Sequence, residues 1–148
     1  MGEDLALTTS AIMSLVEKLE EDSAAFYEKL ASRFEEGRGV FLEFAEESRK
    51  NKIHLVRTYQ ETISDALEAT FSFQGLDLSG LEVAMPEDIS LQEALEMARS
   101  LEQKASSLYA RIAEQSQSLL ATIPRAFLRV ARKREARIET LQEMLERA

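Results

Sequence analysis

With 148 residues, the chain fits a single domain, residues 1–148, that is long enough to bury a sizeable hydrophobic core. Its hydrophobic fraction of 45% and charged fraction of 30% are those of an ordinary globular protein, which argues against a disordered chain. The lack of cysteine excludes disulfides, thiolate catalysis and cysteine-bound metal clusters, and the net charge of −9 opposes general binding to nucleic acid.

The sequence also bears on where the protein acts. The first ten residues, MGEDLALTTS, are acidic and lack an apolar core, so we expect no signal peptide. No uninterrupted apolar run in the sequence is long enough to cross a bilayer. We therefore expect a cytoplasmic protein with no membrane partner.

Two helices are predicted in the first half. Apolar residues recur at steps of three and four from about Thr9 to Glu35, and again from Val40 to about Ala69. Two glycines within residues 36–39 favour a helix end between these segments, because glycine tolerates the left-handed cap conformation.

A crossover and a second helix pair are predicted in the other half. Residues 70–89 contain two glycines and a proline and are predicted to form a long link. Ser90 begins a third helix with Glu93 as its capping-box partner, and that helix continues to about Ser118. A fourth helix starts near Pro124, a residue that suits a first helical turn, and runs to the C-terminus.

The second helix pair repeats the first. Short loops within each pair and a long link between the pairs predict an all-α, antiparallel four-helix bundle with one long crossover between the second and third helices. The matched residues are Glu20, Tyr27, Phe41 and Ala45 in the first pair and Glu102, Tyr109, Phe127 and Ala131 in the second.

Polar residues interrupt the apolar stripe of every predicted helix. Helical periodicity turns Glu20 inward on the first helix and Glu102 inward on the third. Buried charge is costly unless it is paired, so the inward polar residues mark the candidate site. The inward positions on the second and fourth helices are Ser48, Asn51, Arg134 and Arg137.

At these residues the chain resembles the rubrerythrin branch of the ferritin-like superfamily, over nearly all of its length. In that family the first and third helices carry a glutamate seven residues before a tyrosine, as Glu20 and Glu102 precede Tyr27 and Tyr109 here. The second and fourth helices of the family carry phenylalanine, alanine and then Glu-x-x-His, which points two ligands at a pair of iron ions. The resemblance implies a ferritin-like fold.

Both Glu-x-x-His elements are replaced in this chain, by Ser48 and Asn51 on the second helix and by an arginine pair on the fourth. Only Glu20 and Glu102 keep the identity of family ligands, so they are the candidate metal residues. Arginine cannot bind a cation, but its guanidinium can fork onto a carboxylate. We therefore expect Arg134 and Arg137 to supply the countercharge for Glu102 and Glu20 in place of metal.

Other residues leave alternatives open. His54 lies on one helical face with Glu47 and Asn51, so a displaced metal site is one interpretation, and a packed or exposed histidine is the favoured one. Tyr27 and Tyr109 are either neighbours of a metal, as in the family, or core aromatics with a satisfied hydroxyl.

A non-catalytic structural or interaction role, with no cofactor and as a homodimer, is the favoured hypothesis. The alternative, implied by the resemblance, is an iron-binding oxidoreductase of the peroxidase or ferroxidase type, which would need an external reductant because no cysteine is present. A nucleic-acid partner is disfavoured, because the basic segment 125–137 is expected to neutralise acidic residues across a helix interface. The apolar residues Phe71, Phe73, Leu76 and Leu78 must be covered, by the bundle or by a second subunit.

Overall fold

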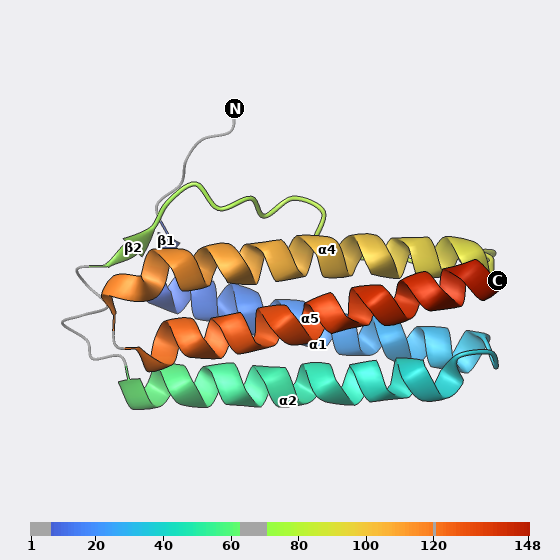
Figure 1. The fold of residues 1–148 in the computed structure, drawn as a ribbon, viewed down its shortest axis with the longest axis horizontal. Helices are drawn as coiled ribbons and strands as arrows, with labels where there is room; N and C mark the ends of the chain where they lie inside the picture. Colours follow the sequence, from blue (N-terminus) through green and yellow to red (C-terminus); the bar gives the residue numbers. More distant parts are fainter. Residues whose placement is uncertain (1–6, 63–70, 120) are drawn as a thin grey trace.

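Four long helices lie side by side in the computed structural model, which describes residues 7–62, 71–119 and 121–148 (Figure 1). This confirms the predicted all-α bundle. The helices are α1 (Thr9–Arg33), α2 (Arg38–Thr62), α4 (Leu91–Gln115) and α5 (Thr122–Arg147), and a short 3₁₀ helix, η1 (Ser116–Ser118), follows α4.

Both helices of the first pair begin close to the predicted positions, and α1 also ends close to its predicted end. The Thr8 side chain caps α1 by accepting a hydrogen bond from the Ala11 backbone N–H at 3.0 Å. Gly37, with φ of 83°, makes the turn into α2, which begins two residues earlier than predicted. The predicted end of this helix, near Ala69, lies outside the described residues.

The start of α4 confirms the predicted capping box. The Ser90 hydroxyl accepts a hydrogen bond from the Glu93 backbone N–H at 3.1 Å, and the Glu93 carboxylate accepts one from the Ser90 backbone N–H at 3.0 Å. The predicted end of this helix at Ser118 is corrected, because α4 ends at Gln115 and its last turn tightens into η1. Pro124 lies in the first turn of α5.

The link between the pairs contacts both ends of α1. Near its start, β1 (Leu7–Thr8) pairs in antiparallel fashion with β2 (Ser72–Phe73), with Leu7 opposite Phe73. At the other end, the Arg33 guanidinium donates hydrogen bonds to the carbonyl oxygens of Pro86, at 3.0 Å, and Glu87. The two-residue strands were not predicted from the sequence, because residues 70–89 showed only the composition of a loop.

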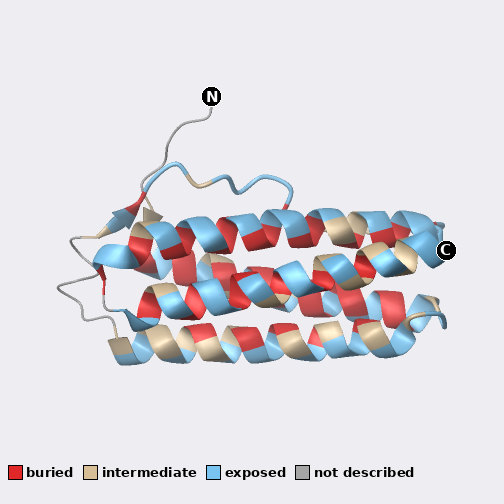
Figure 2. Cartoon of the chain, in the orientation of Figure 1, coloured by how far each residue is buried: buried red, intermediate tan, exposed pale blue. Residues whose placement is uncertain are grey.

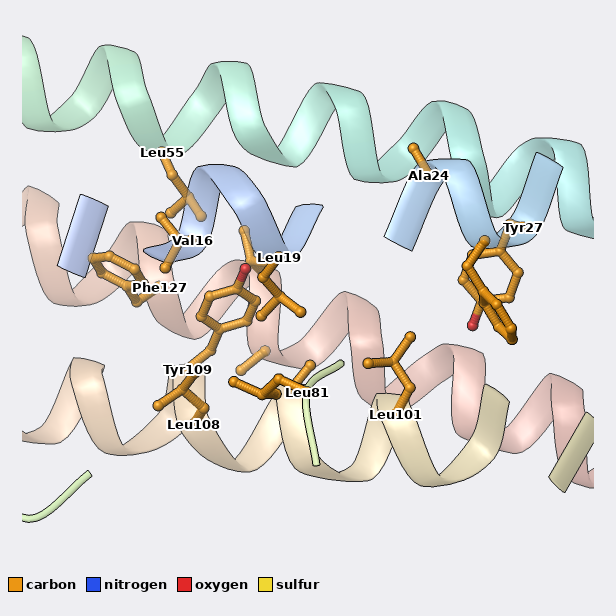
Figure 3. Packing of buried hydrophobic residues seen from close by; sticks show 14 of the residues in the cluster. Val16, Leu19, Ala24, Tyr27, Leu55, Leu81, Leu101, Leu108, Tyr109 and Phe127 are labelled. Carbon is orange, nitrogen blue, oxygen red and sulfur yellow. The ribbon is translucent and has the colours of Figure 1, made fainter. Parts of the chain in front are cut away.

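Buried residues recur along all four helices (Figure 2), and most of them are apolar and form one hydrophobic core. Figure 3 shows Val16 and Leu19 of α1 close to Tyr109 of α4 inside the bundle. Each helix thus buries one stripe and leaves the opposite face to solvent. No helix in the described part of the chain is long and apolar enough to span a membrane.

The apolar residues of the link are covered mainly by the bundle itself. Phe73 is buried, and Phe71 and Leu76 are half-buried against the core. The rings of Phe71 and Phe73 pack edge to face with centroids 4.9 Å apart. Leu78 remains 38% exposed. The prediction that this cluster packs on something is confirmed for three of its four residues, and no second subunit is required to cover them.

Candidate functional site

Polar residues from all four helices meet in the middle of the bundle. Every position that helical periodicity turned inward is at least 98% buried, which confirms the predicted orientations. Two carboxylates and two guanidinium groups therefore share one low-dielectric interior. The six residues are Glu20, Ser48, Asn51, Glu102, Arg134 and Arg137.

Two tyrosine–glutamate hydrogen bonds cross between α1 and α4. Tyr27 donates its hydroxyl hydrogen to Glu102 Oε2 at 2.5 Å, and Tyr109 donates to Glu20 Oε2. Each tyrosine lies two helical turns after the glutamate of its own helix. Because α1 and α4 run in opposite directions (Figure 1), that tyrosine comes to lie beside the glutamate of the other helix. The sequence repeat thus becomes a reciprocal pair of contacts.

Arg134 bridges the two buried carboxylates. Its Nη1 lies 2.9 Å from Glu102 Oε1 and 3.0 Å from Glu102 Oε2, and its Nη2 lies 2.9 Å from Glu20 Oε2. Nη2 also donates a hydrogen bond to Ser23 Oγ at 3.0 Å. Charge-assisted contacts of this kind are shorter and stronger than those between neutral groups.

Arg137 connects the buried centre to the edge of the bundle. Its Nη1 donates to Glu102 Oε2 at 3.1 Å, and its Nε donates to Glu47 Oε1 at 2.7 Å. The Glu47 side chain is 33% exposed, so this carboxylate lies where the network reaches solvent. The Arg137 guanidinium also lies 5.7 Å from the Tyr27 ring centroid and 5.3 Å from that of Phe44, within the range of cation–π attraction.

Glu102 and Arg134 are held ionised by their charged neighbours. Burial alone would raise the pKa of Glu102, but the guanidinium groups of Arg134 and Arg137 outweigh burial, so its pKa lies below its usual value. Burial opposes the charged form of Arg134 as well, and Glu102 and Glu20 still raise its pKa well above the ordinary value. Burial, followed by the neighbouring carboxylates, raises the pKa of Tyr27 and Tyr109, so both phenols stay protonated as donors.

Several buried polar atoms of the centre have no hydrogen-bond partner among the residues that the structure describes. Ser48 and Asn51 are shorter than the arginines that occupy the matching positions of α5, and neither Ser48 Oγ nor Asn51 Nδ2 is bonded. The hydrogen bonds of the centre are therefore unevenly distributed, since the arginines of α5 make most of them and the polar residues of α2 make few. The remaining unbonded atoms of the centre are Glu20 Oε1, Arg134 Nε and Arg137 Nη2.

The donor set of this centre does not fit a pair of iron ions. Glu20 and Glu102 face inward as predicted, but Arg134 donates to both of them, so a positive group occupies the space beside Glu20 Oε2 and beside both Glu102 oxygens where a metal cation would bind. Nowhere in residues 7–62, 71–119 and 121–148 do three or more histidine, aspartate or glutamate side chains gather closely enough to hold a metal ion.

The displaced metal site considered for His54 is not assembled either. Glu47 is engaged by Arg137, Asn51 is buried, and His54 is half-buried at the surface. Burial lowers the pKa of His54, and the nearby cations Arg129 and Lys133 lower it further. A positive environment of this kind opposes a bound metal cation.

Sequence reasoning missed two partners of the arginines. Ser23 accepts from Arg134, and Glu47 accepts from Arg137. A signal was present for Ser23, which lies three residues after Glu20 on the same inward row. For Glu47 the sequence gave only a helical face shared with His54, and the choice of Arg137 depends on how α2 and α5 are aligned.

Comparisons with known proteins add no relative. No family model, no curated protein and no solved structure matches the chain.

Proposed function

We propose that this protein is a rubrerythrin-related, ferritin-like bundle that works without a metal centre, in a non-catalytic structural or interaction role. The observation that carries the proposal is the position of Arg134, whose guanidinium contacts Glu20 and Glu102 together. In the resembled family those two positions are iron ligands. Here two buried guanidinium groups balance two buried carboxylates, which is the charge relationship that metal ions would otherwise supply.

The interaction role is proposed to include a homodimer in the cytoplasm. Three large apolar side chains on the outer surfaces of α2 and α5 support an association with another protein surface, since they gain by removal from water. They are Leu42, Ile53 and Leu128, which are 49%, 53% and 38% exposed. Nucleic acid is not a proposed partner, because the net charge of −9 repels it.

The experiment is thermal unfolding of chelator-free protein with and without Fe²⁺ under anaerobic conditions. We expect stoichiometric Fe²⁺ to leave the Tm unchanged, because a ligand that does not bind the native state cannot stabilise it. A rise in Tm, together with iron retained on the protein after desalting, would overturn the proposal and favour the di-iron oxidoreductase instead.

A double variant supplies the matched positive control. Arg134→Glu with Arg137→His restores the Glu-x-x-His spacing on α5. The two new side chains would join Glu20 and Glu102 as metal ligands. We expect this variant, unlike the wild type, to gain thermal stability with Fe²⁺, by about 2.7 kcal/mol at a hundredfold excess over the Kd. An equal response of the two proteins would show that the arginines are not what excludes metal.

A further inference from the structure

The solvent side of α5 carries a line of mostly charged residues, and exposed positions recur along the whole helix (Figure 2). The members of this line follow one another at steps of four and three, so they share one helical face, and all of them are exposed. We call this line the α5 stripe. In chain order it consists of Arg125, Arg129, Arg132, Ala136, Glu139 and Glu143. The stripe is therefore basic in its first half and acidic in its second half.

The charges of the α5 stripe are unfavourable within the helix that carries them. Arg125 lies in the first turn, where the helix dipole favours an anion. It also repels Arg129 one turn further on, as Glu139 repels Glu143 in the acidic half. The three arginines form no ion pair with any residue that the structure describes. Glu143 has only a contact of 4.0 Å with Arg147, between two exposed side chains. The stripe thus holds charges that the chain itself leaves largely uncompensated.

The charges on the neighbouring helices do not change the division of the stripe. The end of α2 lies beside the start of α5, since two threonine hydroxyls lie 3.1 Å apart there. Arg57 and Glu61 in this part of α2 are both exposed and have opposite charges, so together they add little net charge beside the basic half. On α4, Arg111 and Glu114 are likewise a pair of opposite charges, 3.6 Å apart. The basic half of the stripe therefore keeps its sign.

We propose that the α5 stripe is the contact surface of a homodimer, in which it packs antiparallel against the α5 stripe of a second copy. Arg125 then faces Glu143 of the other copy and Arg129 faces Glu139, because both pairs have the same midpoint on the helix. A two-fold axis through that midpoint forms each ion pair twice, which is how a surface pairs with itself in a symmetric dimer. The inference rests on the homodimer of the proposed function and names its surface.

Charge complementarity selects the antiparallel orientation, because a parallel pairing would bring like charges together. The net charge of −9 on each copy opposes association only weakly. At physiological ionic strength the screening length is about 8 Å, so distant charges are largely screened while charges in contact still attract. Leu128, which is 38% exposed, borders the basic half and would gain by removal from water in the dimer.

Reversing the charge of one half at a time tests this pairing, with sedimentation equilibrium as the measurement. The first variant is Arg125→Glu with Arg129→Glu, and the second is Glu139→Arg with Glu143→Arg. Each alone should dimerise about a hundredfold more weakly than the wild type, because every attractive pair becomes repulsive. An equimolar mixture of the two variants should form a heterodimer, since their stripes then carry opposite charges. Circular dichroism checks that both variants keep the fold.

Lys29→Glu with Lys50→Glu is the matched control, because it changes the net charge by the same amount as the first variant at exposed positions of α1 and α2. It should dimerise as the wild type does. Dimerisation of both reversed variants at the level of the control would overturn the α5 surface and leave the homodimer standing. Reversed variants that stay monomeric when mixed would overturn the antiparallel pairing. A monomeric wild type would overturn the inference together with the homodimer, whereas the metal-free centre is decided separately by the response to Fe²⁺.

Discussion

The guanidinium of Arg134 contacts the acid of α1 and the acid of α4 at once, so a single side chain from the second helix pair controls the charge of both. Lysine could not replace it, because an ammonium is a point charge without the planar fork that faces two carboxylates. The contacts to Glu102 and Glu20 are all 3.0 Å or shorter. Each remaining partner of the centre then has a defined role: Tyr109 supports Glu20, and Arg137 and Tyr27 support Glu102.

Replacing Arg134 by leucine should destabilise the bundle. Glu20 would keep only the Tyr109 hydroxyl and would become an uncompensated buried charge, a change that costs about 3–5 kcal/mol. Urea unfolding followed by circular dichroism measures this difference. Arg132→Leu, at an exposed position of the same helix, is the control and should change the free energy of unfolding by no more than about 0.5 kcal/mol. A similar loss in both variants would argue against a special role for Arg134.

Acid should weaken the fold partly through Glu102. The pKa of Glu102 is lower in the folded protein than its unfolded value of about 4.3, so the unfolded state binds more protons between the two values. The stability that Glu102 contributes is therefore complete above the unfolded pKa and is lost as the pH falls through the folded pKa. Urea midpoints measured from pH 6 down to pH 3 should fall less steeply in Glu102→Gln than in the wild type. Parallel curves would contradict this assignment.

For single residues, the sequence predicted which side chains point into the bundle better than it predicted which partner each of them bonds. A 3.6-residue period is a local property, so it correctly turned Glu20, Glu102, Arg134 and Arg137 inward. The pairing of Arg134 and Arg137 with the acids followed from the need to compensate buried charge. Which tyrosine bonds which glutamate depends on the relative shift of two helices along their axes, and no local pattern encodes that shift.

Among the elements, the link between the pairs does more than connect α2 to α4. It places Phe73 in the core beside the start of α1 and tethers its far end to Arg33. The β1–β2 pairing holds Ser72 and Phe73 of the link by backbone hydrogen bonds, and this pairing fixes the register in which the Phe73 ring enters the core. The link therefore contributes a buried side chain to the core in addition to those of the four helices.

Phe73→Ala should show this contribution as a loss of about 3–5 kcal/mol in the free energy of unfolding, because truncating a fully buried ring leaves a cavity. Chemical denaturation would measure the loss. Leu78→Ala, a few residues further along the same link, removes a side chain that is 38% exposed and should cost clearly less. If Phe73→Ala and Leu78→Ala had the same free energy of unfolding, the link would not contribute to the stability of the core.

Helix boundaries were predicted where side-chain caps mark them. The capping box at Ser90 follows from residue types three positions apart, and the structure confirms it. α2 starts two residues earlier than predicted. Of the two glycines in residues 36–39, Gly37 has a positive φ and ends the turn, whereas Gly39 already lies in the helix. The β1–β2 pairing escaped prediction because it joins short segments that lie far apart in the sequence.

At the scale of the whole molecule, the two helix pairs depend on one another. The hydroxyl that satisfies Glu20 comes from α4, and the one that satisfies Glu102 comes from α1. The arginines that neutralise both acids come from α5. The α1–α2 pair brings no buried cation for Glu20, and the α4–α5 pair brings two buried guanidinium groups for the single carboxylate of Glu102, so partial unfolding would leave uncompensated charge in the remaining half.

We therefore expect a single cooperative unfolding transition. Near-UV circular dichroism reports the packing of Tyr27 and Tyr109, and far-UV circular dichroism reports the helices, so the two should give the same urea midpoint. Separate midpoints, with tyrosine packing lost while much of the helix signal remains, would show that one pair persists alone.

The unequal sharing of charge between the halves has a consequence for how copies of this chain can assemble. The α1–α2 half brings a buried carboxylate and no buried cation, whereas the α4–α5 half brings one carboxylate and two guanidinium groups. Two α1–α2 halves joined together would enclose only negative charge, and two α4–α5 halves would enclose twice as many guanidinium groups as carboxylates. Only unlike halves give a neutral interior. The buried charges thus disfavour the pairing of two like halves from different copies of the chain. This protects a chain whose two halves are similar against mispaired domain swapping.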